Sequence, residues 1–434
     1  TLPVALGILL EQSKRNMPYY LSMGCIGTAI VVLPAGMSRS AWIAVVVSCA
    51  WVYALYRLDR KQAATRLRQH KRWYIIGGIL GGILLLGGSA SLYTLKKDSA
   101  DGRFLMWKIT TKAIQKQPIT GTSLGGFPAA YAETQAEYMA SGKATEQEKL
   151  VAGCPEYAFN EYLQIGLEQG LVGLALFIGW LGLLFYKGIK NKRYACCGGL
   201  MSLAIFAFSS YPLQLPEFWV VLIFLGVMSV TPDKDEIREN QAESNGHRWG
   251  KQIFFMGIAI LGIGLFWMQK DHYKAYQQWN KAQMFYNNKA YEAALEVYEP
   301  LYPLLKHKPE FLFEAAQSLS KTGQYEKANE YLERAVLLSS DPMLYYVMAK
   351  NKQSLGKYLQ AEKDLLHAVD ILPERIYPYY LLAGLYAEPS YYQPVKLKTA
   401  IDSVLIKKPK VESTAIKEMK EKARKMLNNT STEM

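Results

Sequence analysis

Two features of this sequence have the composition of a phosphate-binding site. Arg39 stands between Ser38 and Ser40 at the start of an apolar run, so one guanidinium and two hydroxyls can donate to an anion. An arginine that snorkels from the end of a membrane span is the other interpretation. The turn Gly121–Phe127 can bring backbone amides up to a phosphate, but no strand is expected before it, so it is no dinucleotide fingerprint and a plain structural turn fits as well.

The turn Gly121–Phe127 belongs to a polar stretch from Asp101 to Gln164 that interrupts a series of hydrophobic segments. Arg39 lies outside this stretch and is expected on the same side of the membrane. A loop this long costs conformational entropy unless it folds and has a function, so we expect the chemistry here. The pattern predicts an amphipathic helix that begins at Gly102–Arg103 and ends before Pro118. Residues Glu133 to Lys149 are predicted to form a mobile, polar surface excursion, that is, a segment exposed to solvent.

The first 268 residues carry the apolar segments. Helices are expected throughout, because a spanning segment must satisfy its own backbone groups in lipid. Leu2–Leu10 is too short to span and reads as the end of a helix, with further helices expected ahead of Thr1. The seven predicted spans are 17–34, 41–56, 73–93, 170–186, 195–211, 216–231 and 251–268.

The distribution of Lys and Arg residues predicts which loops lie on the cytoplasmic side of the membrane. The loop Arg57–Arg72 carries seven Lys or Arg residues against one Asp, and 187–193 carries four. Both belong in the cytoplasm by the positive-inside rule. The loop 94–169, the turn Tyr211–Glu217 and everything after residue 268 then lie on the periplasmic side. The formal charge of +13 over 434 residues is explained by this placement, so no nucleic-acid partner is expected.

The remainder of the chain repeats at a period near 34. The pattern Tyr-x2-Ala starts at Tyr291, Tyr325 and Tyr358, with small residues where paired helices touch. This is the tetratricopeptide signature. Three units are expected at about 275–308, 309–342 and 343–376, followed by a degenerate unit near 377–410 and a capping helix. Such an array either recruits a protein partner or acts as a stabilising lid.

Several ordered motifs in residues 17–231 resemble the O-antigen ligase and polymerase superfamily of polytopic membrane glycosyltransferases. The resemblance rests on Ser-Arg-Ser-Ala-Trp at a span start, Gly-Arg-x3-Trp, Pro-x2-Gly-x3-Gly-Gly-Phe-x3-Tyr, and Asn-Glu-Tyr-Leu-Gln. It implies an enzyme that takes a glycan from undecaprenyl pyrophosphate and transfers it to an acceptor hydroxyl on a lipid A core sugar, a growing glycan or a protein. Lipopolysaccharide and cell-envelope synthesis is the implied setting.

By motif position, the resemblance assigns catalytic and phosphate-binding roles to Arg39 and Arg103. Cations of this kind stabilise the charge on a departing pyrophosphate. The resemblance also implies that further motif residues contact the substrate. These are Trp107, Gly125, Asn160 and Tyr162.

The sequence departs from the family pattern at the general base. Many ligases have a histidine just ahead of the Asn-x-Tyr-Leu motif, whereas this chain has Glu156-Tyr157-Ala158-Phe159 there. Either Glu156 replaces the base, or this branch works without one. The alternative for Glu156, and for Glu161, is a solvated or capping carboxylate.

Neighbouring residues have structural alternatives as well. Asn160 either orients substrate or caps the following helix. Tyr131, Tyr157 and Tyr162 fit interfacial anchors as well as ligands.

The predicted fold is all-α: a polytopic membrane domain, 1–268, followed by a periplasmic α-solenoid of tetratricopeptide repeats, 269–434. We expect a multi-pass protein of the bacterial inner membrane that acts as a glycan transferase, with two alternatives: a repeat-unit polymerase, or an inactive membrane-anchored scaffold. No cofactor or metal is expected, since the five cysteines lack ligand spacing and Asp233-Lys234-Asp235 falls in a polar linker. Expected partners are the lipid-linked donor, a lipid, glycan or protein acceptor, the bilayer, and a protein on the repeats.

Overall fold

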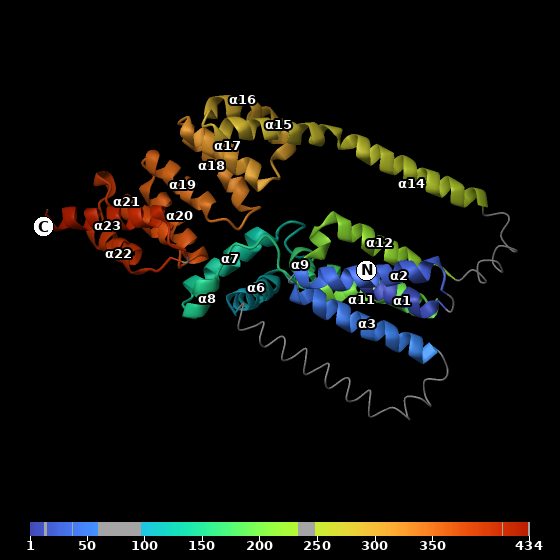
Figure 1. The fold of residues 1–434 in the computed structure, drawn as a ribbon. Helices are drawn as coiled ribbons and strands as arrows, with labels where there is room; N and C mark the ends of the chain where they lie inside the picture. Colours follow the sequence, from blue (N-terminus) through green and yellow to red (C-terminus); the bar gives the residue numbers. More distant parts are fainter. Residues whose placement is uncertain (13–14, 37, 60–96, 233–247, 410, 433–434) are drawn as a thin grey trace. The chain divides into compact units, whose positions relative to one another are not determined.

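The computed structural model describes residues 1–12, 15–36, 38–59, 97–232, 248–409 and 411–432 (Figure 1). The regular structure of these residues is entirely helical. Chain contacts divide them into two units. Unit 1 holds 1–107, 114–122 and 157–248, and unit 2 holds 108–113, 123–156 and 249–434.

Unit 1 contains the apolar helices. They are α1 (Leu2–Glu11), α2 (Met17–Ala35), α3 (Arg39–Asp59), α9 (Glu161–Glu168), α10 (Gly170–Lys190), α11 (Tyr194–Ala207) and α12 (Pro216–Val230), with the 3-10 turn η1 (Pro212–Gln214) and both ends of α6 (Lys97–Lys116).

Helix α11 is the centre of this packing and contacts α1, α3, α10 and α12. Its Leu200 is fully buried, in a cluster with Leu184 and Leu225. Gly198 and Gly199 allow this closeness, because a Cβ on either would lie within 3 Å of a neighbouring side chain. Small residues at helix crossings are the usual means of close packing for apolar helices.

The outer faces of these helices remain apolar and exposed. Leu176 is 71% exposed and Val220 is 69% exposed. Two helices in the described part of the chain, α3 and α10, are long and apolar enough to cross a membrane, with mean hydropathies of 1.6 and 1.8. Helices also occur at the other described predicted spans, but α2, α11 and α12 have shorter apolar stretches. The seven-span arrangement therefore stays a prediction, and the span 73–93 lies outside the described residues.

Unit 2 is an array of antiparallel helix pairs. The pairs are α15 (Lys270–Asn287) with α16 (Tyr291–Leu305), α17 (Pro309–Lys321) with α18 (Tyr325–Val336), α19 (Met343–Ser354) with α20 (Tyr358–Ile371), and α21 (Ile376–Tyr386) with α22 (Pro394–Ile406). Helix α14 (Arg248–Met268) precedes them, η2 (Pro389–Tyr391) lies within the last pair, and α23 (Thr414–Thr432) packs on α22.

These pairs confirm the predicted repeats and the capping helix. The repeated alanines Ala294, Ala328 and Ala361 are fully buried, because a larger side chain there would hold paired helices apart. Gly323 and Gly356, which end the first helices of two pairs, have φ of +83° and +71°.

Part of the polar loop packs on the repeats, so the prediction of a surface excursion at 133–149 was wrong for residues 134–139, which are mostly buried, whereas most of residues 140–149 are exposed. Its helices are α7 (Phe127–Ala140) and α8 (Glu146–Val151), and α7 packs against α20. Tyr131, predicted as an interfacial anchor, is 2% exposed inside this packing. The misreading arose because Thr134 and Gln135 are polar yet buried, so composition alone suggested a solvated face.

Candidate functional site

The backbone carbonyl of Ser209 accepts hydrogen bonds from Arg103 and from Ser40, the residue after Arg39. Arg103 Nη1 donates to the Ser209 carbonyl at 2.9 Å, and Ser40 Oγ donates to the same oxygen at 3.3 Å. Arg103 comes from α6, Ser40 from the first turn of α3, and Ser209 follows the end of α11. Helix α6 begins at Lys97, five residues before the predicted start at Gly102, so Arg103 lies within the helix rather than at its end.

Arg39 and Arg103 influence each other electrostatically. Burial, and next the like charge of Arg39, lower the pKa of the half-buried Arg103, while Tyr211 opposes this shift. An arginine remains protonated at neutral pH despite such a shift. Two cations brought together in a partly desolvated place create a positive potential that favours an anion.

An aromatic wall lies beside Arg103. The Phe159 ring centroid is 5.2 Å from the guanidinium carbon, a cation–π arrangement. Tyr211 packs edge-on against Phe159 at 4.8 Å and is stacked with Tyr157 at 5.3 Å. Phe159 has φ of +49°, which is unusual for a bulky residue and is found most often at functional sites.

Trp107 and Tyr162 extend this wall through Phe208. Trp107 packs edge-on against Phe208 at 5.6 Å and donates from Nε1 to the Ala158 carbonyl at 3.1 Å. Tyr162 lies 6.4 Å from Phe208 and donates from its hydroxyl to the Ala204 carbonyl at 2.9 Å. Both polar groups thus hold the backbone, and Trp107 lies one turn after Arg103 on α6.

Asn160 caps the helix that follows it. Its Oδ1 accepts from the backbone amides of Tyr162 and Leu163, both at 3.1 Å, and the residue is 4% exposed. Such a cap stabilises a helix by about 1 kcal/mol. The structure therefore gives Asn160 the capping geometry, and contact with substrate stays a proposal.

One interpretation of the sequence was that Glu161 is a solvated carboxylate, but the structure shows that it is buried. The residue is 1% exposed and accepts from Leu213 N at 2.6 Å and Gln214 Nε2 at 3.0 Å. Burial raises its pKa, and these hydrogen bonds oppose the rise. Glu161 thereby fastens the turn 212–214, which directly follows Tyr211, to the start of α9.

Two glycines allow the loop to cross the start of α10. Gly121 and Gly170 have φ of +70° and +69°, and a Cβ on Gly170 would lie 2.0 Å from the Ile119 carbonyl oxygen. The crossing is closed by hydrogen bonds from Leu171 N to Pro118 O at 2.7 Å and from Thr122 N to Leu167 O at 2.9 Å. Only glycine fits two backbones this close.

The other two predicted site residues belong to unit 2. Gly125 is exposed, with φ of +75° and open space around its missing Cβ, so its geometry is that of a turn glycine. Glu156 is exposed and lines a cavity of the repeat array. Unit 1 thus brings together Arg39, Arg103, Trp107, Asn160 and Tyr162, and it does not contain Gly125 or Glu156.

A buried amide in unit 2 was missed from the sequence. Gln135 is fully buried, donates from Nε2 to Gly153 O at 3.0 Å and Ile371 O at 2.8 Å, and accepts from the Tyr131 hydroxyl at 2.7 Å. One side chain therefore joins α7, the segment before Glu156, and the end of α20. No sequence signal distinguishes this Gln from the solvated ones.

Phe159, Ser209 and Tyr211 were also missed as members of the arginine site. Phe159 and Tyr211 stand next to motifs that were recognised, but a backbone carbonyl such as Ser209 has no sequence signal. Within the described residues, no group of His, Cys, Asp and Glu could hold a metal ion. The Asp233-Lys234-Asp235 sequence lies outside the described residues.

Comparison with known families confirms the resemblance. The family model described as O-Antigen ligase matches residues 24–178, which include all seven predicted site residues. The model described as Anaphase-promoting complex, cyclosome, subunit 3 matches residues 287–368 and supports the tetratricopeptide character of the repeats. No curated protein matches the chain.

Solved structures are similar only to part of the chain. The structure titled "Crystal structure of MamA" is 16% identical, covers 35% of this chain and 96% of its own, and has a TM-score of 0.28. A "Podosopora anserina putative kinesin light chain nearly identical TPR-like repeats" structure is 18% identical, covers 37% and 89%, and has a TM-score of 0.30. Scores this low support no argument, so the repeat assignment rests on the helix pairs and the family match.

Proposed function

We propose that this chain transfers a glycan from undecaprenyl pyrophosphate to an acceptor hydroxyl at the periplasmic face of the bacterial inner membrane. The match to the O-antigen ligase family indicates a membrane glycosyltransferase-like function. The donor, the acceptor and the orientation are our proposal.

The arginine site carries the proposal. Arg103 and Ser40, the residue next to Arg39, donate to one carbonyl, the charge of Arg39 acts on Arg103, and the aromatic wall of Phe159 and Tyr211 lies beside Arg103. When the bond from the sugar to the pyrophosphate breaks, negative charge grows on the departing phosphate. Two preplaced guanidinium groups stabilise that charge without reorganisation, which is the usual largest contribution of such a site. The hydroxyl of the acceptor loses its proton in the same step, and Glu156 is the proposed base.

The test is transfer of a fluorescent glycan from purified undecaprenyl-pyrophosphate donor by the full chain in nanodiscs. We expect Arg103→Ala and Arg39→Ala to lower kcat by about 10²–10³, the effect of removing one preorganised donor at a charge-developing oxygen. Arg103→Lys should recover only part of the rate, because an ammonium lacks the paired donors of a guanidinium.

Two controls separate charge from structure. Arg57→Ala removes a cation from the far end of the same helix, α3, where Arg57 donates to the Tyr53 hydroxyl. Ser40→Ala removes the second hydrogen bond to Ser209 without removing a charge. Arg57→Ala should retain most of the rate, and Ser40→Ala should lower the rate less than Arg39→Ala does. Unchanged transfer by Arg39→Ala and Arg103→Ala would refute the proposed site, and a product ladder would identify a polymerase rather than a ligase.

A further inference from the structure

The repeat array of unit 2 contains a cavity of about 750 Å³ that the arginine site does not use. Three of its walls are the starts of α17, α19 and α21, the first helices of successive pairs. The remaining wall is the loop segment that ends at Glu156. The lining residues are Cys154, Glu156, Pro309, Glu310, Phe313, Glu314, Ser339, Ser340, Asp341, Pro342, Met343, Leu344, Tyr346, Leu372, Arg375 and Tyr377.

A non-helical piece of this chain, residues 152–155, already lies beside the repeats, and Cys154 of this piece lines the cavity. The Ser340 hydroxyl donates to the Pro155 carbonyl at 3.2 Å, so the repeats hold this segment by its backbone. This edge of the repeats therefore already binds a polypeptide backbone.

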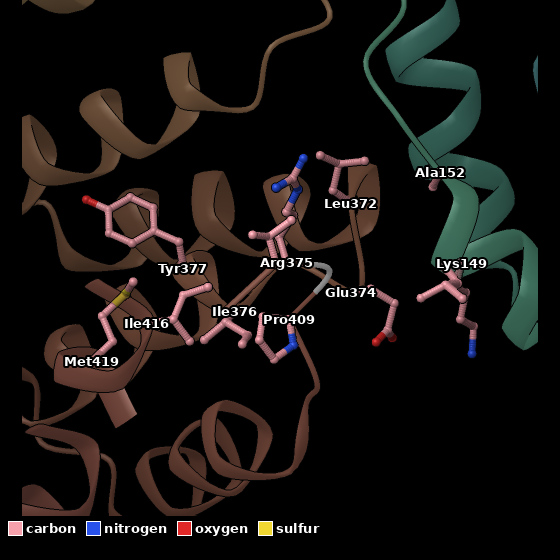
Figure 2. Close-up of a pocket in the computed structure, with 12 residues that line it drawn as sticks. Lys149, Ala152, Leu372, Glu374, Arg375, Ile376, Tyr377, Pro409, Ile416 and Met419 are labelled. Atoms are coloured by element: carbon pink, nitrogen blue, oxygen red, sulfur yellow. The ribbon is translucent and has the colours of Figure 1, made fainter. Parts of the chain in front are cut away.

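Three aromatic residues line the cavity together with the polar ones. Tyr346 is 4% exposed, and Phe313 and Tyr377 are half-buried. A smaller cavity of about 200 Å³ shares Leu372, Arg375 and Tyr377 with the first. Figure 2 shows Lys149 and Ala152 of the loop on one side of this smaller cavity and the residues of the repeats on the other. Aromatic side chains beside fixed polar groups are typical of binding sites.

The charge of the cavity differs from that of the chain. Four carboxylates face one guanidinium, Arg375, a net charge of −3 in a protein whose net charge is +13. The carboxylates are Glu156, Glu310, Glu314 and Asp341.

Two of these carboxylates are held in place. Glu314 accepts from Trp279 Nε1 at 2.8 Å, Gln283 Nε2 at 2.9 Å and the Tyr298 hydroxyl at 3.0 Å. Asp341 Oδ1 accepts from Met343 N at 2.9 Å. A fixed negative field repels an anionic lipid pyrophosphate and attracts a cationic partner.

We propose that this cavity binds an extended, basic segment of an acceptor polypeptide, an inference that rests on the proposed transferase function. The aromatic lining and the bound backbone of segment 152–155 favour a polypeptide, and the charge selects a basic one. In the chain, Glu156 of this segment is followed directly by Tyr157–Asn160. The acceptor of the glycan is accordingly a protein hydroxyl rather than a lipid A sugar.

The test measures binding without transfer. Three synthetic peptides share a Ser/Thr/Ala framework and carry lysines, glutamates or glutamines at the same positions. Their binding to the full chain in phosphatidylcholine nanodiscs is followed by fluorescence anisotropy at low and high salt. The uncharged lipid avoids attraction of the lysine peptide to the bilayer. We expect the lysine peptide to bind most tightly and to lose affinity as salt rises.

The variants test the cavity itself. Glu310→Gln and Asp341→Asn should each weaken the lysine peptide by about two- to fivefold, the range of a single exposed charge pair. Glu326→Gln is the matched control, because Glu326 is also an exposed acid in the first turn of a repeat helix but does not line the cavity. Equal binding of the three peptides, or no effect of Glu310→Gln, would overturn the inference.

A parallel transfer assay keeps the two proposals distinguishable. Cavity-dependent peptide binding without any glycan transfer would sustain the inference on the cavity and overturn the proposed function. Transfer to a lipid A core sugar, with no binding of the lysine peptide, would sustain the transferase and overturn the inference.

Discussion

The substitution Gln135→Ala tests whether the repeats hold the loop that leads to Glu156. It removes the bond to Ile371 O, which joins the loop to the repeats, and it also removes the bond to Gly153 O and the acceptor of the Tyr131 hydroxyl, which lie within the loop. Three neutral hydrogen bonds at about 1 kcal/mol each give a total loss of stability of about 3 kcal/mol. Only the bond to Ile371 O breaks when the loop leaves the repeats, so its loss of about 1 kcal/mol should make local detachment about fivefold more frequent.

Cys154 is a native reporter of this detachment. It is half-buried in the cavity wall, one residue after Gly153. The assay follows labelling of Cys154 by a membrane-impermeant maleimide in the full chain, with the other four cysteines replaced by serine or alanine. Labelling of Gln135→Ala should be about fivefold faster than that of the parent, as long as opening precedes reaction.

Gln147→Ala is the control, because Gln147 lies on α8 in the same loop and is exposed. It should label at the parent rate. If Gln135→Ala also labels at the parent rate and remains folded, the hydrogen bonds of Gln135 do not hold the loop on the repeats.

Three further perturbations follow from the structure. Gly170→Ala should destabilise the protein by about 2–5 kcal/mol, from left-handed φ and a backbone clash, whereas Gly125→Ala, in open space, should cost only about 1–2 kcal/mol; thermal unfolding in detergent compares them. Asn160→Ala should cost about 1 kcal/mol and Asn160→Asp almost nothing, since aspartate keeps the cap; an equal loss in both would contradict a capping role. Burial opposes ionisation of Glu148, but hydrogen bonds, chiefly from Lys108, lower its pKa to about 2, so the stabilisation is present above pH 4.5 and lost as the pH falls toward 2. The protection factors of the α8 amides, which correct for the intrinsic pH dependence of exchange, should fall over that interval in the parent and change little in Glu148→Gln.

The sequence predicted the repeats well because their signal is local and repeated. Small residues at Ala294, Ala328 and Ala361 recur with the period of a helix pair, and the buried alanines follow directly from that spacing. Apolar composition likewise predicted helices at α3 and α10, since length and hydropathy are properties of a single segment. Composition did not predict the fold of the polar loop, where Tyr131 and Gln135 are buried among residues that read as a solvated face.

The sequence by itself therefore determined that the apolar segments at α3 and α10 are helical and where the repeats fall, and it assigned two arginines to a family motif. Only the tertiary structure decided that the Ser209 carbonyl holds Arg103 and Ser40 together, that Glu161 is buried, and that Gln135 ties α7 to the repeats. The reason is physical: propensity and periodicity act over a few residues, whereas burial of a polar group depends on partners that are distant in sequence, and those partners are often backbone atoms without any residue identity.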